Sequence, residues 1–252
     1  MLVALTIAVA NQKGGVAKTT TVAALGAALA EQGRSVLLVD LDPQACLTYS
    51  LGFDPDDLDP TIHDVLVGRN KASDAILDVE EEKLAVLPAN IDLAGAEAYL
   101  LMRTGREYAL RQALEASNGF DVVLIDCPPS LGVLTINGLT AADEVVIPMQ
   151  CETLSHRGVG QLLETIDDVK RLTNHGLTVR GLIPTMFDGR TNHAREVLED
   201  VGSRYSLPVL EPPVRKSVRF AEAPRSGRTI IRFSPKHPGA DAYRRIAETL
   251  VP

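Results

Sequence analysis

Residues 3–20, Val-Ala-Leu-Thr-Ile-Ala-Val-Ala-Asn-Gln-Lys-Gly-Gly-Val-Ala-Lys-Thr-Thr, constrain the fold of this chain more than any other segment. The apolar run 2–10 is short and leads to a pair of glycines, which is typical of a buried strand. From Thr19 to Gln32 apolar residues recur at helical spacing, and Gly33 follows as a C-terminal cap. The segment therefore predicts a strand, a glycine-rich turn and a helix in succession.

A turn in this position can bind phosphate groups. Gly14 and Gly15 allow successive backbone N–H groups to turn inward around phosphate oxygens, and the helix N-terminus adds a partial positive charge. We expect Lys18 to reach the β- and γ-phosphates of a nucleotide and the Thr19 hydroxyl to ligate magnesium. The expected nucleotide-contacting residues of the turn are Lys13, Gly14, Gly15, Val16, Ala17, Lys18, Thr19 and Thr20.

The turn departs from the ordinary phosphate-loop pattern at two positions: Ala17 stands where glycine is usual, and Lys13 precedes the glycine pair. The pattern Lys-Gly-Gly-x-x-Lys-Thr resembles the signature of the deviant phosphate-loop ATPases, the ParA/Soj family of the ParA/MinD superfamily. In that family the first lysine crosses a dimer interface to the partner's nucleotide. The resemblance therefore implies an ATP-dependent homodimer that Lys13 completes. Ala17 adds only a methyl group, so we expect the loop still to bind nucleotide. The methyl group could slow nucleotide exchange or tighten nucleotide binding.

A second apolar run, 35–40, predicts a buried strand that ends in Asp40-Leu41-Asp42-Pro43-Gln44. Two carboxylates at such a strand end can hold magnesium-bound water or orient an attacking water. The alternative is an ordinary turn with helix-capping acids. The segment resembles the Asp-x-Asp-Pro-Gln motif of the ParA family, which implies that Asp42 supports hydrolysis. We interpret Cys46, which follows, as a packing residue.

Segment 120–129 predicts a third buried strand with Asp126 at its carboxyl end, where open α/β sheets place their ligands. Asp126 there can bind magnesium through water, and the stiff loop 128–130 can sense the γ-phosphate. Together with the two earlier motifs, this implies ATP and Mg²⁺ as cofactors. The expected metal ligands are Thr19, Asp42 and Asp126, and the expected catalytic residues are Lys13, Lys18 and Asp42.

Charge is distributed unevenly along the chain, whose formal net charge is −8. Residues 180–252 carry thirteen Lys and Arg against eight Asp and Glu, whereas residues 1–179 carry twelve against twenty-five. A basic patch of this sort can bind phosphates while the acidic remainder limits indiscriminate binding, although charge runs are usually just solvated surface. The basic cluster between 215 and 232 consists of Arg215, Lys216, Arg219, Arg225, Arg228 and Arg232.

The last third of the chain also resembles the ParA/Soj family. Arg190 and Arg219 match family positions that bind DNA phosphates without reading sequence. Lys216 stands where the family usually has an arginine, so the charge is kept. These cations could supply salt-sensitive phosphate contacts. The alternative is that Arg219 pairs with a neighbouring carboxylate. By the same resemblance Met186 and Pro213 contact adenine, although both could equally be packing residues.

The expected fold is α/β: a phosphate-loop NTPase with a twisted, mainly parallel sheet of about seven or eight strands, helices on both faces, and one domain over residues 1–252. Further strands are expected at 84–87, 144–148 and 179–184. Further helices are expected at 61–67, 92–99, 107–116, 131–141, 153–173, 192–202 and from 238 onward. We interpret the acidic run 78–82 as solvated surface, with a partner contact as the alternative.

The resemblance implies a partitioning ATPase that binds DNA non-specifically and that a ParB-like partner stimulates, in the cytoplasm and on the nucleoid. An orphan relative that positions another cargo is an alternative, because only the partner differs. A MinD-like membrane ATPase is another, although no segment beyond the last helix is left to act as an anchor. A metabolic phosphate-loop enzyme is weaker, since the motifs show no second-substrate pocket. The three dispersed cysteines are expected to be reduced thiols, and we expect no signal peptide.

Overall fold

The computed structural model describes residues 4–116, 119–152, 155–189 and 191–251. Among these residues, seven strands form one sheet in the order β3-β4-β2-β5-β1-β6-β7. Every neighbouring pair is parallel except β3 with β4. The strands are β1 (Leu5–Val9), β2 (Val36–Asp40), β3 (Leu77–Val79), β4 (Leu84–Leu87), β5 (Val122–Asp126), β6 (Glu144–Gln150) and β7 (Thr178–Thr185).

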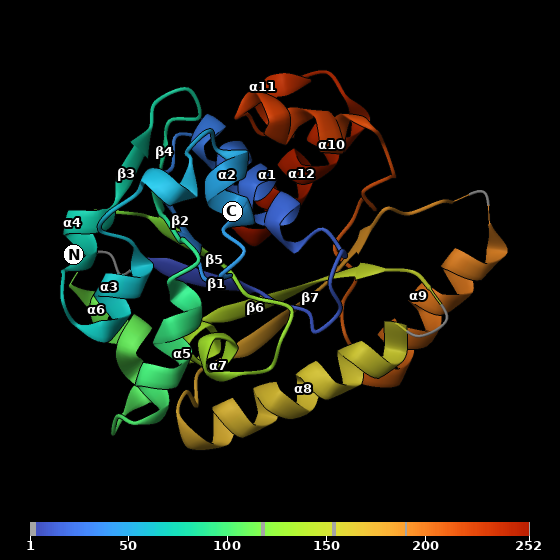
Figure 1. Cartoon of the computed structure of the whole chain (residues 1–252). Coiled ribbons are helices and arrows are strands. Elements are labelled where there is room, and N and C mark those ends of the chain that lie inside the picture. The colour runs from blue at the N-terminus through green and yellow to red at the C-terminus, as the bar shows by residue number, and fades with distance from the viewer. Residues whose placement is uncertain (1–3, 117–118, 153–154, 190, 252) are drawn as a thin grey trace.

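Helices cover both faces of the sheet (Figure 1). One face carries α1 and α12, which pack on each other, and the other carries α5, α7 and α8. The helices, with η marking a 3-10 helix, are α1 (Lys18–Glu31), α2 (Cys46–Ser50), η1 (Pro55–Asp57), α3 (Ile62–Val67), α4 (Ala72–Ala75), α5 (Leu93–Leu101), η2 (Arg106–Tyr108), α6 (Ala109–Glu115), α7 (Val133–Ala141), α8 (Ser155–Leu172), α9 (Asn192–Tyr205), α10 (Arg219–Glu222), η3 (Ala223–Ser226), α11 (Ile230–Phe233) and α12 (Pro238–Leu250).

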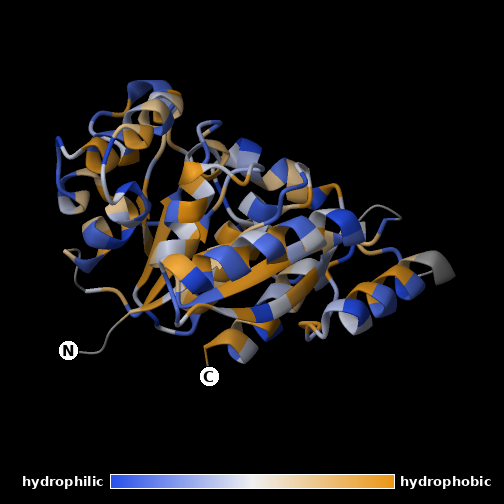
Figure 2. Cartoon of the chain, turned by 90° about the horizontal axis from the view of Figure 1, so that it is seen from below, coloured by the Kyte–Doolittle hydropathy of each residue, from blue (hydrophilic) through white to orange (hydrophobic). Residues whose placement is uncertain are grey.

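Alternate residues of the central strands serve two separate apolar layers. Ile7 and Val9 of β1 pack in the layer beneath α1 and α12, whereas Ala8 packs in the layer beneath the opposite helices. The strands therefore read as continuous apolar runs, as expected for a parallel sheet that is buried on both faces. Figure 2 shows the same arrangement: apolar strands run through the middle, and many outward-facing helical residues are hydrophilic.

The parallel register brings the functional strand ends together. Val9 of β1 pairs with Asp126 of β5, and Asp40 of β2 pairs with the same residue from the other side. The turn after β1 therefore begins beside two strand ends that carry carboxylates. This is the edge at which open α/β sheets bind their ligands.

The structure confirms the predicted single-domain, mainly parallel α/β architecture. It corrects three local predictions. The antiparallel strand β3 was not expected, and the helix expected at 107–116 divides into η2 and α6. Within the acidic run 78–82 the Glu82 side chain is fully buried rather than solvated, because its carboxylate accepts hydrogen bonds from Thr229. No helix in the described ranges has the length and hydropathy needed to cross a membrane.

Candidate functional site: a phosphate loop beside buried carboxylates

The turn between β1 and α1 is held by bonds to neighbouring strands. Asn11 donates from Nδ2 to the Pro148 carbonyl (2.7 Å), and its Oδ1 accepts from the backbone N–H of Lys13 (2.9 Å). Thr185, fully buried at the end of β7, donates to the Val16 carbonyl (2.9 Å). The loop is therefore fixed before any ligand arrives.

Two residues of the loop have left-handed backbone. Gly15 has φ 73°, which glycine adopts without strain. Ala17 has φ 67° and ψ 34° at the N-cap of α1, where an L residue is strained. The left-handed conformation explains why glycine is usual at this position. In this chain Ala17 adopts that conformation despite its methyl group.

Lys18 begins α1 and is only 7% exposed. Its Nζ donates to the Lys13 carbonyl (3.4 Å), so the side chain folds back over the loop. Burial lowers the pKa of the Lys18 ammonium, and the charge of Asp126 opposes that shift. An anion bound in the loop would supply the negative charge that this buried cation needs.

Asp126 and Asp40 are both buried at the carboxyl ends of their strands. Among the described residues neither oxygen of Asp126 has a hydrogen-bond partner. Burial, followed by the charge of Asp40, raises the pKa of Asp126 well above its usual range. The Thr19 hydroxyl nearby, which does not reach hydrogen-bonding geometry, and the charge of Lys18 oppose that shift. A buried acceptor without a partner fits a site where a cation or its water shell binds.

Asp40 acts as an anchor for the adjacent loop. Its Oδ2 accepts from the backbone N–H (2.9 Å) and the hydroxyl (2.7 Å) of Thr48, while Oδ1 accepts from the N–H of Asp42 (3.3 Å). Burial raises the pKa of Asp40 to about 6, and the Thr48 bonds oppose that shift. Asp42 lines the site's cavity, whereas Asp40 holds the loop that carries it. The sequence motif assigns a role in hydrolysis to Asp42 alone, and it does not predict the anchoring role of Asp40.

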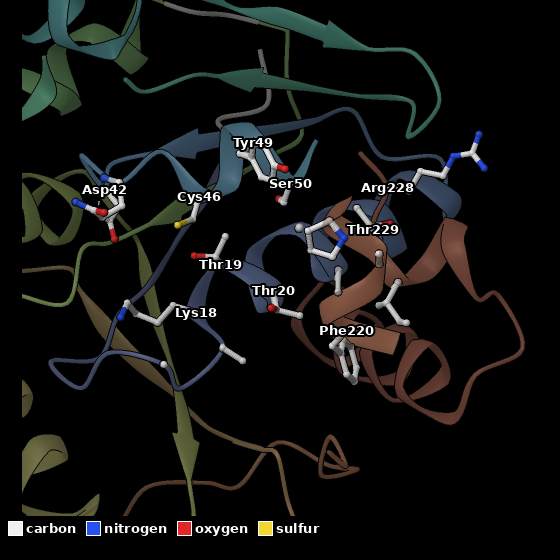
Figure 3. A pocket seen from close by; sticks show the side chains of 18 of the residues that line it. Lys18, Thr19, Thr20, Asp42, Cys46, Tyr49, Ser50, Phe220, Arg228 and Thr229 are labelled. Carbon is white, nitrogen blue, oxygen red and sulfur yellow. Dashed lines mark hydrogen bonds between the residues drawn. The ribbon is translucent and has the colours of Figure 1, made fainter. Parts of the chain in front are cut away.

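A cavity of about 580 Å³ extends from the phosphate loop along one side of α1. In Figure 3, Lys18, Thr19 and Asp42 lie at one end, and Phe220 and Thr229 form the far wall. Cys46 also lines this cavity and is exposed, so its interpretation as a packing residue was wrong: at the start of α2 its side chain faces the cavity rather than the core. The far wall was not predicted, because α10 and α11 are distant in sequence.

The residues expected to hold magnesium fit that role chemically. Thr19 and Asp42 line the same cavity, and Asp126 lies buried close enough to Lys18 to influence its pKa. Within the described ranges no group of three or more His, Cys, Asp or Glu side chains forms a metal site by itself. A magnesium ion here would therefore share its ligands with nucleotide oxygens and water, as is common for this metal.

Lys13 lies apart from the cavity. Its Nζ forms an ion pair with Glu152, which follows β6, and both side chains are partly exposed (39% and 50%). Lys13 lines a separate hollow of about 480 Å³ with Arg157, and Pro129 borders both hollows. Neither Lys13 nor Glu152 lines the 580 Å³ cavity.

The expected adenine residues lie on neighbouring segments. The N–H of Phe187 donates to the Val214 carbonyl (3.0 Å), and the N–H of Val214 donates to the Pro184 carbonyl (2.7 Å). Met186 and Pro213 are thus brought near each other beyond β7. Neither lines the 580 Å³ cavity, and their contact with adenine stays a prediction.

The expected DNA-contacting residues lie only in part within the described structure. Arg190 is outside the described residues. Lys216 and Arg219 are exposed near α10. Arg219 pairs with Glu222 (2.9 Å), as the alternative interpretation proposed, and its side chain stays 52% exposed. An exposed pair is worth about 0–1 kcal/mol, so this guanidinium can exchange the carboxylate for a phosphate at little cost.

Comparison with known proteins places this site in a family. The AAA_31 family model, described as an AAA domain, matches residues 4–179. The sporulation initiation inhibitor protein Soj of Bacillus subtilis is 45% identical over 243 residues, covering 96% of each chain. The chromosome partitioning protein ParA of Caulobacter vibrioides is 42% identical over 248 residues, covering 97% of this chain and 93% of that relative.

Among solved structures, a Mycobacterium smegmatis protein described as cobyrinic acid a,c-diamide synthase, with bound ADP and magnesium, is 58% identical. The match covers 99% of this chain and 94% of the other, with a TM-score of 0.89. The same protein was also solved with an ATP analogue and magnesium. The phosphate loop, its deviant lysine and the full-length likeness to Soj and ParA agree: the chain belongs to the ParA/Soj family of ATPases, in the ParA/MinD superfamily.

Proposed function

We propose that this protein is a partitioning ATPase in which ATP and Mg²⁺ join two copies face to face. The observation that carries the proposal is the placement of Lys13, which lies outside the cavity of its own phosphate loop and in a hollow that opens beside it. Its Nζ pairs with Glu152 of the same chain, but both side chains are partly exposed, so a phosphate of a second copy's nucleotide can replace that carboxylate at little cost. The names of the relatives Soj and ParA and the magnesium nucleotides in the M. smegmatis structures support the proposal.

In the proposed ATP-bound dimer each residue of the site has a separate role in hydrolysis. The N–H groups of the loop, with Lys18 and the partner copy's Lys13, stabilise charge on the phosphates. Thr19 and Asp126 hold magnesium, which neutralises phosphate charge when it is bound. Asp42, on the loop that Asp40 anchors, orients the attacking water.

We further propose that the dimer binds DNA without sequence preference through Lys216, Arg219 and Arg190, and that it is nucleoid-associated. Arginines and lysines on a rigid face contact phosphates in a salt-dependent way. A ParB-like partner stimulates hydrolysis and releases the dimer from DNA. A relative that positions another cargo on DNA would use the same residues, so the neighbouring gene distinguishes these two roles.

Binding to random-sequence DNA in four states tests the proposal: without nucleotide, and with ADP, ATP or ATP plus Mg²⁺. Binding is expected only with ATP and Mg²⁺, is prolonged in Asp42→Ala and is lost in Arg219→Glu. Arg111→Glu on α6, a surface arginine that also pairs with a glutamate of its own helix, Glu115, is the matched control and should bind as wild type. ATP-dependent dimers that ignore DNA at low salt would contradict the DNA role.

An amide-forming function is the competing proposal, because the 58% identical structure is described as a diamide synthase. Release of ammonia from glutamine requires an activated nucleophile, usually a thiol with a lowered pKa. Burial instead raises the pKa of all three thiols: Cys46, Cys127 and, to about 11, Cys151. Turnover of glutamine or cobyrinic acid by the purified protein would favour the synthase, whereas DNA-stimulated ATP hydrolysis alone favours partitioning.

Membrane attachment through α12 is not supported by its packing. Its apolar residues Tyr243, Ile246 and Leu250 are buried in the layer that they share with α1. Tyr243 also forms a buried hydrogen bond with Thr21 (3.0 Å). The apolar face of this helix is used within the domain, so the helix would have to leave its place to bind lipid.

A further inference from the structure

The turn between β3 and β4 contacts a segment that lies 147 residues later in the chain. Glu82 of this turn accepts two hydrogen bonds from Thr229: the backbone N–H donates to Oε1 (2.9 Å) and the hydroxyl to Oε2 (2.9 Å). Thr229 is the N-cap of α11, so Glu82 satisfies an N-terminal donor of that helix. The neighbouring Glu81 pairs with Arg228 (2.8 Å).

The Glu82 side chain is fully buried, which makes its position costly unless it is paired. Burial raises the pKa of its carboxyl, and the bonds from Thr229 and the charge of Arg232 oppose that shift. Arg232 lies 3.9 Å from Oε2. A buried carboxylate with two charge-assisted hydrogen bonds fixes its partner more firmly than an exposed ion pair does.

The segment that Glu82 holds connects the cavity to the exposed basic face near α10, which Lys216 and Arg219 form. Thr229 and Arg228 line the cavity that begins at the phosphate loop, and the same chain leads back through η3 and α10 to Arg219. A further attachment is a close backbone contact at Gly227, where an added Cβ would lie 2.8 Å from the Cα of Gly52. The segment 219–228 is thus held at its C-terminal end by Thr229 on Glu82, by Arg228 on Glu81 and by the Gly227 contact. Nearer its start, Phe220 packs edge-to-face on Tyr243.

We infer that Glu82 is a positioning residue for the DNA-binding face: by holding Thr229 it helps to fix the segment 219–228, which carries Arg219 and follows closely after Lys216 of that face. The inference rests on the proposed function, since it requires that this face bind DNA. It gives the β3–β4 turn a role opposite to the one its charge suggests. A negative charge near a basic face ordinarily weakens phosphate binding, whereas here the carboxylate is needed for it.

The test compares Glu82→Gln with Glu80→Gln in the ATP and Mg²⁺ state. Both remove one negative charge from the same turn, but Glu80 is exposed whereas Glu82 is buried. Glu82→Gln is expected to weaken DNA binding at least about fivefold and to lower the slope of log affinity against log salt by about one phosphate contact. ATP affinity, which depends on the other end of the cavity, should change less than about twofold. Glu80→Gln should bind DNA as well as wild type or slightly better.

The salt slope separates positioning from mere loss of stability, because a smaller folded fraction lowers the amount of active protein but leaves the slope unchanged. Thr229→Val removes the hydroxyl donor from the other side of the contact and should reproduce the effect; it decides the question if Glu82→Gln does not fold. Wild-type affinity and slope in both variants would overturn the inference. So would equal strengthening by Glu82→Gln and Glu80→Gln, which would show a purely electrostatic effect. If wild type itself fails to bind DNA with ATP, the proposed function fails rather than this inference.

Discussion

Replacement of Ala17 by glycine should stabilise the protein, although the residue lies in the functional loop. Ala17 has φ 67° and ψ 34°, a conformation that costs an L residue about 1–2 kcal/mol relative to glycine. The greater conformational freedom of glycine in the unfolded chain lowers stability by about 0.4–1 kcal/mol and so offsets part of the gain from relieved strain. Ala17 is an N-cap and not an interior helical residue, so no helix propensity is lost, and glycine is the better N-cap.

The net expectation is a gain of about 1 kcal/mol, or a rise of about 2–4 °C in Tm for a chain of this size. Urea and thermal unfolding of the nucleotide-free protein measure it. Ala45→Gly is the matched control, because Ala45 is also a left-handed N-cap (φ 50°, ψ 32°) but begins α2 outside the phosphate loop. It should gain a similar amount. Ala17→Val should be strongly destabilised, since a β-branched residue tolerates positive φ poorly. A less stable Ala17→Gly, or a well-tolerated Ala17→Val, would refute the reasoning.

Four further outcomes are expected. Lys18→Ala should abolish ATP binding in a fluorescent-nucleotide titration yet fold normally, because the buried ammonium is costly without an anion. Thr185→Val, which keeps the shape but leaves a loop carbonyl without its donor, should cost about 1–2 kcal/mol in urea unfolding, whereas unchanged stability would discount that bond. Burial raises the pKa of the Glu82 carboxyl, against the opposing effect of the Thr229 hydrogen bonds and the Arg232 charge. The contribution of this carboxyl to folding stability is therefore fully present below about pH 4.3, the usual pKa of Glu, and is lost as the pH rises through the raised pKa. Glu82→Gln should flatten that part of the stability–pH curve. Cys46 should react slowly with a thiol reagent near neutral pH, because partial burial and the charge of Asp42 raise its pKa. Bound ATP should slow the reaction further, because Cys46 lines the cavity; mass spectrometry measures both rates.

The sequence was sufficient to predict the features that local patterns encode. The strand, turn and helix around residues 3–20 and the acids at the ends of β2 and β5 are contiguous motifs, and the parallel sheet brings them together as expected. These predictions succeeded because each motif lies within one strand-to-helix connection.

The features that were missed depend on contacts between distant segments. Strand β3 has three residues, one of them Asp78, and becomes a strand only because β4 lies beside it. Glu82 looks like solvated charge until Thr229 is placed against it. The far wall of the cavity likewise comes from α10, η3 and the start of α11, which have no pattern that predicts a ligand. Such contacts are set by tertiary packing and not by local propensity.

The most direct test of the account is a mixing experiment on ATP hydrolysis with DNA present. Lys13→Ala should bind ATP but lack the lysine that completes its partner's site, and Lys18→Ala should lack ATP binding but retain Lys13. Each variant alone is expected to be inactive. Mixing them should restore hydrolysis, because the Lys18→Ala copy supplies its Lys13 to the nucleotide of the Lys13→Ala copy. A mixture as inactive as either variant alone, or an active Lys13→Ala variant by itself, would contradict the claim that two copies complete one site.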